Sequence, residues 1–431
     1  MKYERIFDVD HRRENKGQLR AALKSLVVLC CVLLIGSGCA PASSNAGASP
    51  APRATPTLPV QSTVVGRSLN DNDLVKAIVD KMSLDQKLGQ MVIVEFYGAN
   101  FNSDLQQMIS QDNIGGVLIE NKNGNAQSRN QLVTLNKAMQ AQARVPLFIS
   151  TDYEGGVVNE LRLITGERPS EATIGATNDP QVAYNAGHSA ASDLSSLGLN
   201  LNFMPIVDVL TNPNNPGLPE RTFGSDPTLV TNMGRAYLKG LTAGGIIGCL
   251  KHFPGLGSAN LDPHLSLPTM NRSLATLSSV DLVPYRTMIN EGTVPMVMVT
   301  HILNPQLDPD LPTSLSPKVV TGLLRQQLNF KGVIISDTLW MGGISNTYSL
   351  SQAAVLAVKA GIDLILGPRG LAETQTMIVG LHQAVTSGQI STSQIDASVT
   401  RILQLKLKYN VISRDEALRL AGITGNSEVR E

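Results

Sequence analysis

The sequence predicts an α/β fold, a TIM-like (β/α)8 barrel, from three observations. Short apolar runs recur along the chain, helical patterns separate them, and polar residues follow most of them directly. Alternating strand-like and helical segments are typical of βα units that share one parallel sheet. A parallel barrel gathers the residues that follow its strands at one rim, where such barrels carry their catalytic groups.

Eight apolar runs are the candidate strands. They are residues 90–96, 116–119, 146–150, 201–207, 246–250, 294–299, 332–336 and 362–366. The stretches between them have helical spacing, and the apolar residues of 390–409 form a stripe that should pack on the barrel. Eight such units in roughly 360 residues suit a (β/α)8 barrel. A doubly wound open sheet is the alternative, but no Gly-x-Gly-x-x-Gly sequence opens a helix.

The first 39 residues have the pattern of a secretory signal. Residues 2–24 are polar and partly basic, residues 25–35 are almost purely apolar, and small residues surround Cys39. The apolar part is short for a spanning helix, which favours a signal peptide. The ending resembles a bacterial lipobox with Cys39 as the lipidated residue, although Gly36 stands where lipoboxes usually carry leucine. An uncleaved membrane anchor is the alternative, and both interpretations place the folded part outside the cytoplasm.

The chain is expected to have three parts. Residues 1–39 are the signal peptide with its lipobox. Residues 40–69 are an Ala-, Pro-, Ser- and Thr-rich linker, which buries too little apolar surface to fold. Residues 70–431 are the barrel, expected to be a single catalytic domain without a second α/β sandwich domain.

Composition limits the function. Lys plus Arg and Asp plus Glu are both 35, so the formal net charge is zero and gives no support for a nucleic-acid partner. Aromatic residues, at 4%, are too few for a groove of stacked rings. Three of the four cysteines lie in the first forty residues, and Cys249 lies in a candidate strand. This excludes an intrachain disulfide framework and a cysteine-based zinc site.

Polar residues follow five successive candidate strands. They are residues 151–156 after the third strand, Asp208 and residues 212–224 after the fourth, residues 251–264 after the fifth, Thr300 and His301 after the sixth, and residues 337–343 after the seventh. Five such groups on successive strands indicate a catalytic rim. Three residues keep two interpretations at this stage. Asp208 acts in the site or holds loops together, His301 lines the pocket or is buried and bonded, and Trp340 walls the pocket or fills the core.

Two motifs suggest acid–base and nucleophilic chemistry. Asp337 follows the strand 332–336 and could be a nucleophile, a metal ligand or a structural cap. No His-x-x-x-His or Asp-x-Asp spacing is present, so we favour the nucleophile and expect no metal and no nucleotide cofactor. Asp262 and His264 are separated by one residue, and in an extended loop they would point the same way. The carboxylate could then orient the imidazole, which is a suitable general acid near neutral pH.

Together these motifs resemble glycoside hydrolase family 3, in its β-N-acetylglucosaminidase (β-hexosaminidase) branch. The resemblance runs from about residue 82 to residue 409. Its segments are Lys251-His252-Phe253-Pro254-Gly255-x-Gly257, Asp262-x-His264, Asp152-x-Glu154-Gly155-Gly156, Asn202-Phe203-x-Pro205-x-Val207-Asp208-Val209, Arg221-x-Phe223-Gly224 and Ser336-Asp337-x-Leu339-x-Met341.

The resemblance implies a retaining mechanism in which Asp337 is the nucleophile and His264, assisted by Asp262, is the acid/base. Most glycosidases use two carboxylates instead. It further implies a set of residues that bind the terminal sugar: Asp152, Arg221, Lys251 and His252, with Met341 beside the sugar. Family members often read Gly-Gly-Arg-Val-x-Arg after the Asp-x-Glu, but residues 155–160 contain neither arginine, and Arg162 is the candidate replacement.

The resemblance leads us to expect a membrane-anchored or secreted exo-β-N-acetylglucosaminidase that acts as a monomer. Its expected substrates are GlcNAc-terminated fragments of cell-wall glycan or chitin, as in peptidoglycan turnover. A family 3 β-glycosidase of other specificity and a glycosyl phosphorylase remain alternatives, since a neutral histidine repels phosphate less than a carboxylate does. A non-catalytic glycan-binding lipoprotein is a further alternative, but it would not need Asp337, Asp262 and His264 together.

Overall fold

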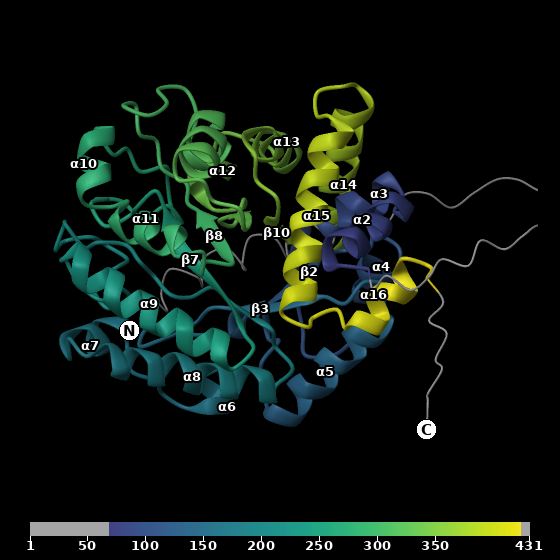
Figure 1. The fold of residues 1–431 in the computed structure, drawn as a ribbon, viewed down its shortest axis with the longest axis horizontal. Helices are drawn as coiled ribbons and strands as arrows, with labels where there is room; N and C mark the ends of the chain where they lie inside the picture. The colour runs from purple at the N-terminus through teal and green to yellow at the C-terminus, as the bar shows by residue number, and fades with distance from the viewer. Residues whose placement is uncertain (1–68, 424–431) are drawn as a thin grey trace, which may run out of the picture. The chain divides into compact units, whose positions relative to one another are not determined.

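The computed structural model describes residues 69–423, whose core is a parallel eight-stranded sheet with helices around it (Figure 1). The predicted signal peptide with Cys39, and the predicted linker except its last residue, lie outside the described residues. The strands are β1 (Val92–Glu95), β2 (Gly116–Ile119), β3 (Phe148–Thr151), β6 (Leu201–Asn202), β7 (Ile247–Phe253), β8 (Met296–Val299), β9 (Val333–Ser336) and β10 (Ile365–Arg369).

The sheet is a nearly closed barrel. Its strand order is β10-β1-β2-β3-β6-β7-β8-β9, and every neighbouring pair is parallel. A single parallel bridge between Ile335 and Leu364 links β9 to the residue before β10. The predicted (β/α)8 barrel is therefore confirmed for the described part of the chain.

Helices connect the strands. The first half contains α2 (Asp71–Lys81), α3 (Leu84–Gln90), α4 (Ser103–Ser110), η2 (Asn121–Asn123), α5 (Arg129–Gln142), α6 (Arg162–Thr165), α7 (Glu171–Ala176), α8 (Pro180–Ser196) and α9 (Pro227–Ala243). The second half contains α10 (Leu274–Ser279), α11 (Val283–Asn290), η3 (Thr313–Leu315), η4 (Lys318–Gln327), α12 (Gly342–Ser345), α13 (Leu350–Ala360), α14 (Gly370–Thr386), α15 (Thr392–Lys408) and α16 (Arg414–Leu420). A hairpin of β4 (Tyr153–Gly155) and β5 (Val158–Asn159) follows β3.

Local sequence explains where several helices begin. Ser83, Ser349 and Ser413 form capping boxes, in which the serine and the side chain three residues later each accept a backbone N–H. Asp179 and Asp226 cap α8 and α9, each followed directly by a proline. The predicted stripe in α15 is also confirmed, because Ile395, Val399, Ile402 and Leu403 are all buried.

Two strands differ from the prediction in length. Only the first two residues of the run 201–207 form β6, and Pro205 within that run has no N–H to give to a ladder. Strand β7 instead continues to Phe253, which pairs with Val299, while Ile206 forms a bridge to Lys251. Lys251 and His252 therefore lie on the strand itself, where the sequence predicted a loop. Within residues 69–423, no helix is both long and apolar enough to cross a bilayer.

Candidate active site

A pocket of about 330 Å³, open solvent included, lies where the loops after β6, β7 and β9 meet. It brings together six of the residues selected from the sequence: Arg221, His252, Asp262, His264, Asp337 and Met341. The other lining residues are Asn215, Pro216, Gly217, Leu218, Leu256, Leu261 and Pro263. Asp152 and Lys251 are not among the lining residues, but they are joined to Arg221 through Glu154.

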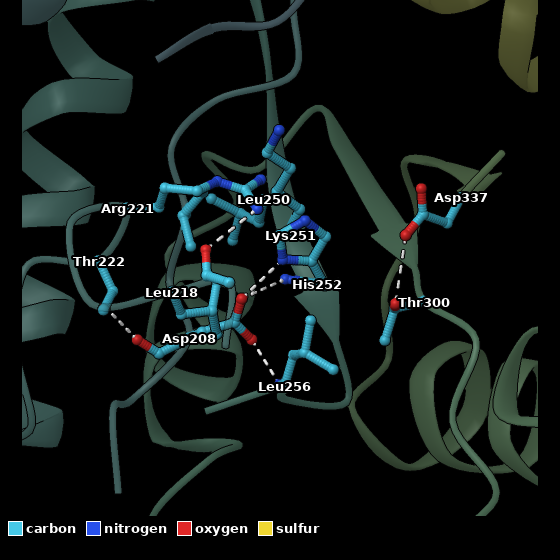
Figure 2. Close-up of polar contacts among 12 residues, drawn as sticks. Asp208, Leu218, Arg221, Thr222, Leu250, Lys251, His252, Leu256, Thr300 and Asp337 are labelled. Atoms are coloured by element: carbon cyan, nitrogen blue, oxygen red, sulfur yellow. Dashed lines mark hydrogen bonds and ion pairs between the residues drawn. The ribbon is translucent and has the colours of Figure 1, made fainter. Parts of the chain in front are cut away.

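Asp337 comes directly after β9, and its N–H donates to the Val299 carbonyl at 2.9 Å. Its carboxylate accepts from the Thr300 hydroxyl at 3.2 Å (Figure 2). It also accepts from the Thr338 N–H at 2.9 Å. Burial acts to raise the pKa of Asp337, but nearby histidines and the Thr338 N–H outweigh it, so the pKa lies below its usual value. A carboxylate that stays ionised in a pocket can act as a nucleophile.

His301 supports the loop after Asp337 from inside the protein. Its Nδ1 lies 2.7 Å from the Ser314 hydroxyl and its Nε2 lies 3.0 Å from the Thr338 carbonyl oxygen. The side chain is buried, and this burial lowers its pKa, so the ring is neutral at neutral pH. Of the two interpretations left open by the sequence, the buried and bonded histidine is therefore the one that the structure supports.

Asp262 and His264 are in contact, as predicted, with His264 Nδ1 2.7 Å from Asp262 Oδ1. The conformation is different from the one predicted, because the segment forms a turn in which Leu265 N–H donates to the Asp262 carbonyl at 3.1 Å. The same Asp262 oxygen also caps this turn by accepting the His264 N–H at 2.9 Å. Burial acts to raise the pKa of Asp262, but its contacts with His264 lower the pKa by more, so the net shift is downward.

The turn that carries His264 is attached to the loop that carries Asp337. The N–H groups of Gly342 and Gly343 donate to the His264 and Pro263 carbonyls, each at 3.0 Å. These glycines begin α12, five residues after Asp337. A Cβ on Gly342 would lie 2.4 Å from the Leu265 carbonyl oxygen, so only glycine allows this close approach. Backbone contacts thus hold both candidate catalytic residues at one pocket.

Glu154 links the cations of the site, and the sequence-based selection missed it. Its two oxygens accept from Arg221 Nε at 2.7 Å and from an Arg221 terminal nitrogen at 2.9 Å. Lys251 Nζ lies 2.6 Å from Glu154 Oε1 and 2.6 Å from Asp152 Oδ1. Burial alone would raise the pKa of Glu154, but Arg221 and Lys251 lower it to about 2. Its position after β3, two residues beyond Asp152, was the signal that could have identified it.

His252 is held by Asp208 from the side away from the solvent. His252 Nδ1 lies 2.7 Å from Asp208 Oδ2, and Figure 2 shows the carboxylate between this ring and the Leu256 backbone. Asp208 is completely buried, so it holds a pocket residue without lining the pocket itself.

The remaining candidates lie elsewhere. Trp340 donates its Nε1–H to Glu95 and is not among the pocket-lining residues. Arg162, the candidate replacement for the missing arginines, forms an ion pair with Glu167 at 3.1 Å and is not among the pocket-lining residues. No cluster of three or more His, Cys, Asp or Glu in residues 69–423 is arranged to hold a metal ion.

Comparisons with known proteins find similar sequences and structures within one family. The family model for the glycosyl hydrolase family 3 N terminal domain matches residues 83–405. Beta-hexosaminidase A of Pseudoalteromonas piscicida is 33% identical over 331 residues, which are 71% of this chain and 55% of that protein. The chain thus spans about half the length of that relative. Beta-hexosaminidase LpqI of Mycobacterium tuberculosis is 32% identical over 394 residues, 89% of this chain and 97% of that protein.

Among solved structures, a glycoside hydrolase family 3 beta-N-acetylglucosaminidase from Paenibacillus sp. str. FPU-7 is similar, with a TM-score of 0.73 and 35% sequence identity. The match covers 79% of this chain and 68% of that one.

Proposed function

The chain belongs to glycosyl hydrolase family 3, and from this premise we propose that it is a retaining exo-β-N-acetylglucosaminidase. One observation carries the proposal: a single pocket is lined by the Asp337 carboxylate and by His264, whose Nδ1 contacts Asp262 at 2.7 Å. A carboxylate and an acid/base on one pocket are the two groups that retaining glycoside hydrolysis needs. The similar β-hexosaminidases support the choice of sugar.

In the first step, Asp337 attacks the anomeric carbon while His264 Nε2–H protonates the glycosidic oxygen. The bond between the anomeric carbon and that oxygen breaks, and the leaving group departs as an alcohol. Asp262 holds the other ring nitrogen, so the imidazolium is stabilised before transfer and Nε2 is directed to the leaving group. The sugar is then bound to Asp337 as an ester.

In the second step, the neutral His264 accepts a proton at Nε2 from a water molecule. That water attacks the anomeric carbon, and Asp337 leaves as a carboxylate. Each step inverts the anomeric carbon, so the two steps together retain its β configuration in the product.

Four residues are proposed to bind the hydroxyls of the terminal sugar: Asp152, Arg221, Lys251 and His252. Met341 is proposed to lie beside the sugar. Lys251 has three N–H donors, of which Asp152 and Glu154 take two, so the third can serve a hydroxyl group. The Asp152 side chain is 26% exposed and the Lys251 side chain 3% exposed, so the Asp152 carboxylate is the more accessible of the two to a ligand from solvent.

The proposal extends to location and substrate source. Residues 1–39 would direct export, lipidation of Cys39 would anchor the chain, and residues 40–69 would tether the catalytic domain 70–431 outside the cytoplasm as a monomer. The proposed substrates are GlcNAc-terminated fragments of cell-wall glycan or chitin, released in peptidoglycan turnover. Cys39→Ala is expected to abolish the incorporation of labelled fatty acid into the protein. Unchanged labelling would contradict lipidation of Cys39.

The activity is tested by release of nitrophenol from its N-acetyl-β-glucosaminide and β-glucoside, each with and without phosphate. We expect hydrolysis of the N-acetylglucosaminide, with the β-anomer formed first in NMR spectra, and loss of activity in Asp337→Ala and His264→Ala. Faster turnover of the glucoside, or a sugar phosphate product, would favour the alternative family 3 activities. A wild type as inert as both variants would leave only a glycan-binding role.

A further inference from the structure

We propose that Asp208 is a positioning residue that acts through His252. It holds the His252 ring with the proton on Nδ1, so that Nε2 is presented to the sugar as a hydrogen-bond acceptor. This inference rests on the proposed function, because it assigns a role within the same pocket.

The contacts of Asp208 carry the inference. Oδ2 lies 2.7 Å from His252 Nδ1 and accepts the His252 backbone N–H at 3.2 Å, while Oδ1 accepts the Leu256 N–H at 2.6 Å (Figure 2). The side chain has no exposed surface, whereas His252 lines the pocket. One buried carboxylate therefore anchors both the ring of His252 and the backbone that follows it.

These contacts determine the tautomer of the ring. Backbone N–H groups can only donate, so both carboxylate oxygens are acceptors. The contact with Nδ1 is then favourable only if that nitrogen carries a hydrogen. A neutral imidazole has a single N–H, which leaves a lone pair on Nε2.

An acceptor at Nε2 complements the other groups that bind the sugar. Arg221 and Lys251 have only donors, the Asp152 carboxylate has only acceptors, and each sugar hydroxyl both donates and accepts. In residues 69–423, no protein group forms a hydrogen bond with His252 Nε2. A sugar hydroxyl could therefore donate to Nε2 while accepting from a neighbouring cation, a pairing that the reverse tautomer would not allow.

Asp208→Asn tests the inference because it preserves the shape but not the acceptors. Asparagine has one oxygen, so its NH₂ group must face either Leu256 N–H or the His252 side. Facing the ring, it would donate to Nδ1 and move the proton to Nε2. We expect kcat/KM to fall by about 10- to 100-fold, by analogy with the loss of hydrogen-bond partners behind metal-bound histidines.

A double-mutant cycle with His252→Ala separates positioning from a merely structural role. If Asp208 acts through the ring, Asp208→Asn should change kcat/KM less than about twofold in the His252→Ala background. An equal loss in both backgrounds would show that Asp208 only holds the backbone, and would overturn the proposal. Thermal unfolding of each variant checks that it is folded.

Imidazole ¹⁵N NMR of the wild type gives a second readout, one that does not depend on activity. The signal missing in His252→Ala identifies the ring, and we expect protonated Nδ1 with unprotonated Nε2. The opposite tautomer would refute the proposal. Asp281→Asn alters another buried carboxylate near this segment, which pairs with Arg272, and should leave the signal unchanged. An inert wild type with the expected tautomer would instead refute the proposed function alone.

Discussion

At the scale of single residues, Glu154 illustrates how a buried charge organises a binding site. Its side chain is 2% exposed, and it pairs with Arg221 and Lys251, the two cations proposed to contact the sugar. Burial of a carboxylate is costly unless cations and hydrogen bonds compensate it. Here both cations supply that compensation, and Glu154 in turn keeps them from moving apart.

Glu154→Gln should therefore reduce both stability and activity. Removing one partner of a buried ion pair leaves uncompensated charge, so we expect the free energy of unfolding to fall by roughly 3–5 kcal/mol. The value of kcat/KM should also fall, because Arg221 and Lys251 lose their common anchor. Urea unfolding and nitrophenyl glycoside hydrolysis at pH 7 measure the two effects. Asp80→Asn, which removes an exposed ion pair with Lys76, should change neither.

The lowered pKa of Glu154 also predicts a pH dependence. Its folded-state pKa of about 2 lies below the ordinary value, so its contribution to stability is present above that ordinary value and is lost as the pH falls towards 2. The stability difference between the wild type and Glu154→Gln should therefore narrow between about pH 4 and pH 2. A difference that stays constant over this range would contradict the ion-pair explanation.

Asp337 predicts the acid limb of the activity profile. Only the ionised carboxylate is a nucleophile, and the pKa of Asp337 is shifted downward. In the His252→Ala variant, where protonation of that ring cannot contribute, kcat/KM should therefore hold as the pH falls until it is below about 3.9, the ordinary aspartate value. Initial rates after brief exposure to each pH measure this limb, and return to pH 7 checks that the protein survived. An acid limb above that value in the His252→Ala variant would argue against Asp337 as the nucleophile.

At the scale of elements, the contact between the turn 262–265 and α12 positions the acid relative to the nucleophile. Hydrogen bonds from Gly342 and Gly343 attach the turn, and the side chain of His264 remains 47% exposed. The turn is therefore anchored through its backbone while the imidazole stays accessible to a leaving group. Glycine at the start of α12 allows the turn to approach this closely, because a Cβ on Gly342 would meet the Leu265 carbonyl oxygen.

Gly342→Ala should selectively impair acid catalysis. Its Cβ would meet the Leu265 carbonyl oxygen at 2.4 Å and displace the turn that carries His264. Substrates with poor leaving groups need the proton and should lose about 100-fold in kcat/KM, which reports the steps up to release of the leaving group, whereas kcat/KM for a dinitrophenyl glycoside should change little. Comparing the two substrates measures the difference.

Gly322→Ala, in η4, is the matched control for Gly342→Ala. Its Cβ would lie 3.7 Å from the Pro317 carbonyl oxygen, which is ordinary van der Waals contact. Equal losses on both substrates in Gly342→Ala would indicate general damage to the site instead of displacement of the acid.

At the scale of the whole barrel, the two ends of the strands have different roles. The pocket lies at the carboxyl ends, and the opposite end contains the buried Lys406 of α15. Its ammonium donates to Gln90 Oε1 at 3.0 Å and to the Gly115 carbonyl at 2.9 Å, both next to strand beginnings. These contacts stabilise this end of the barrel, and the burial of the Lys406 amine makes that stability sensitive to pH.

Burial lowers the pKa of Lys406 to about 7. Between this value and the ordinary lysine pKa of about 10.4, the unfolded chain holds a proton that the folded chain lacks, so the free energy of unfolding rises with pH. The destabilising effect is complete below pH 7. We expect the wild type to gain up to about 1.4 kcal/mol per pH unit relative to Lys406→Met between pH 7 and pH 9.

Urea unfolding at several pH values measures this gain. Lys408→Met, which alters an exposed lysine on the same helix, should follow the wild type. Parallel curves for the wild type and Lys406→Met would show that Lys406 binds its proton equally in both states.

The sequence by itself determined the barrel and the residues that face its rim. Eight apolar runs correspond to the eight strands, and Asp337 follows β9 as expected, because strand patterns and strand ends are local features. The contact of Asp262 with His264 was also predictable, since only one residue separates them. Its backbone conformation was not, because a turn and an extended loop can both bring residues two apart together.

Only the tertiary structure decided how distant residues are paired. Strand β7 continues through Lys251 and His252 because β8 and Ile206 offer it hydrogen-bond partners, which the local sequence cannot reveal. Glu154 meets Lys251 across 97 residues, and Asp208 meets His252 across 44. These long-range contacts decide how the charges are paired and which nitrogen of a histidine carries the proton. The reason is that electrostatic and hydrogen-bond energies depend on the distance between atoms in space, not on their separation in sequence.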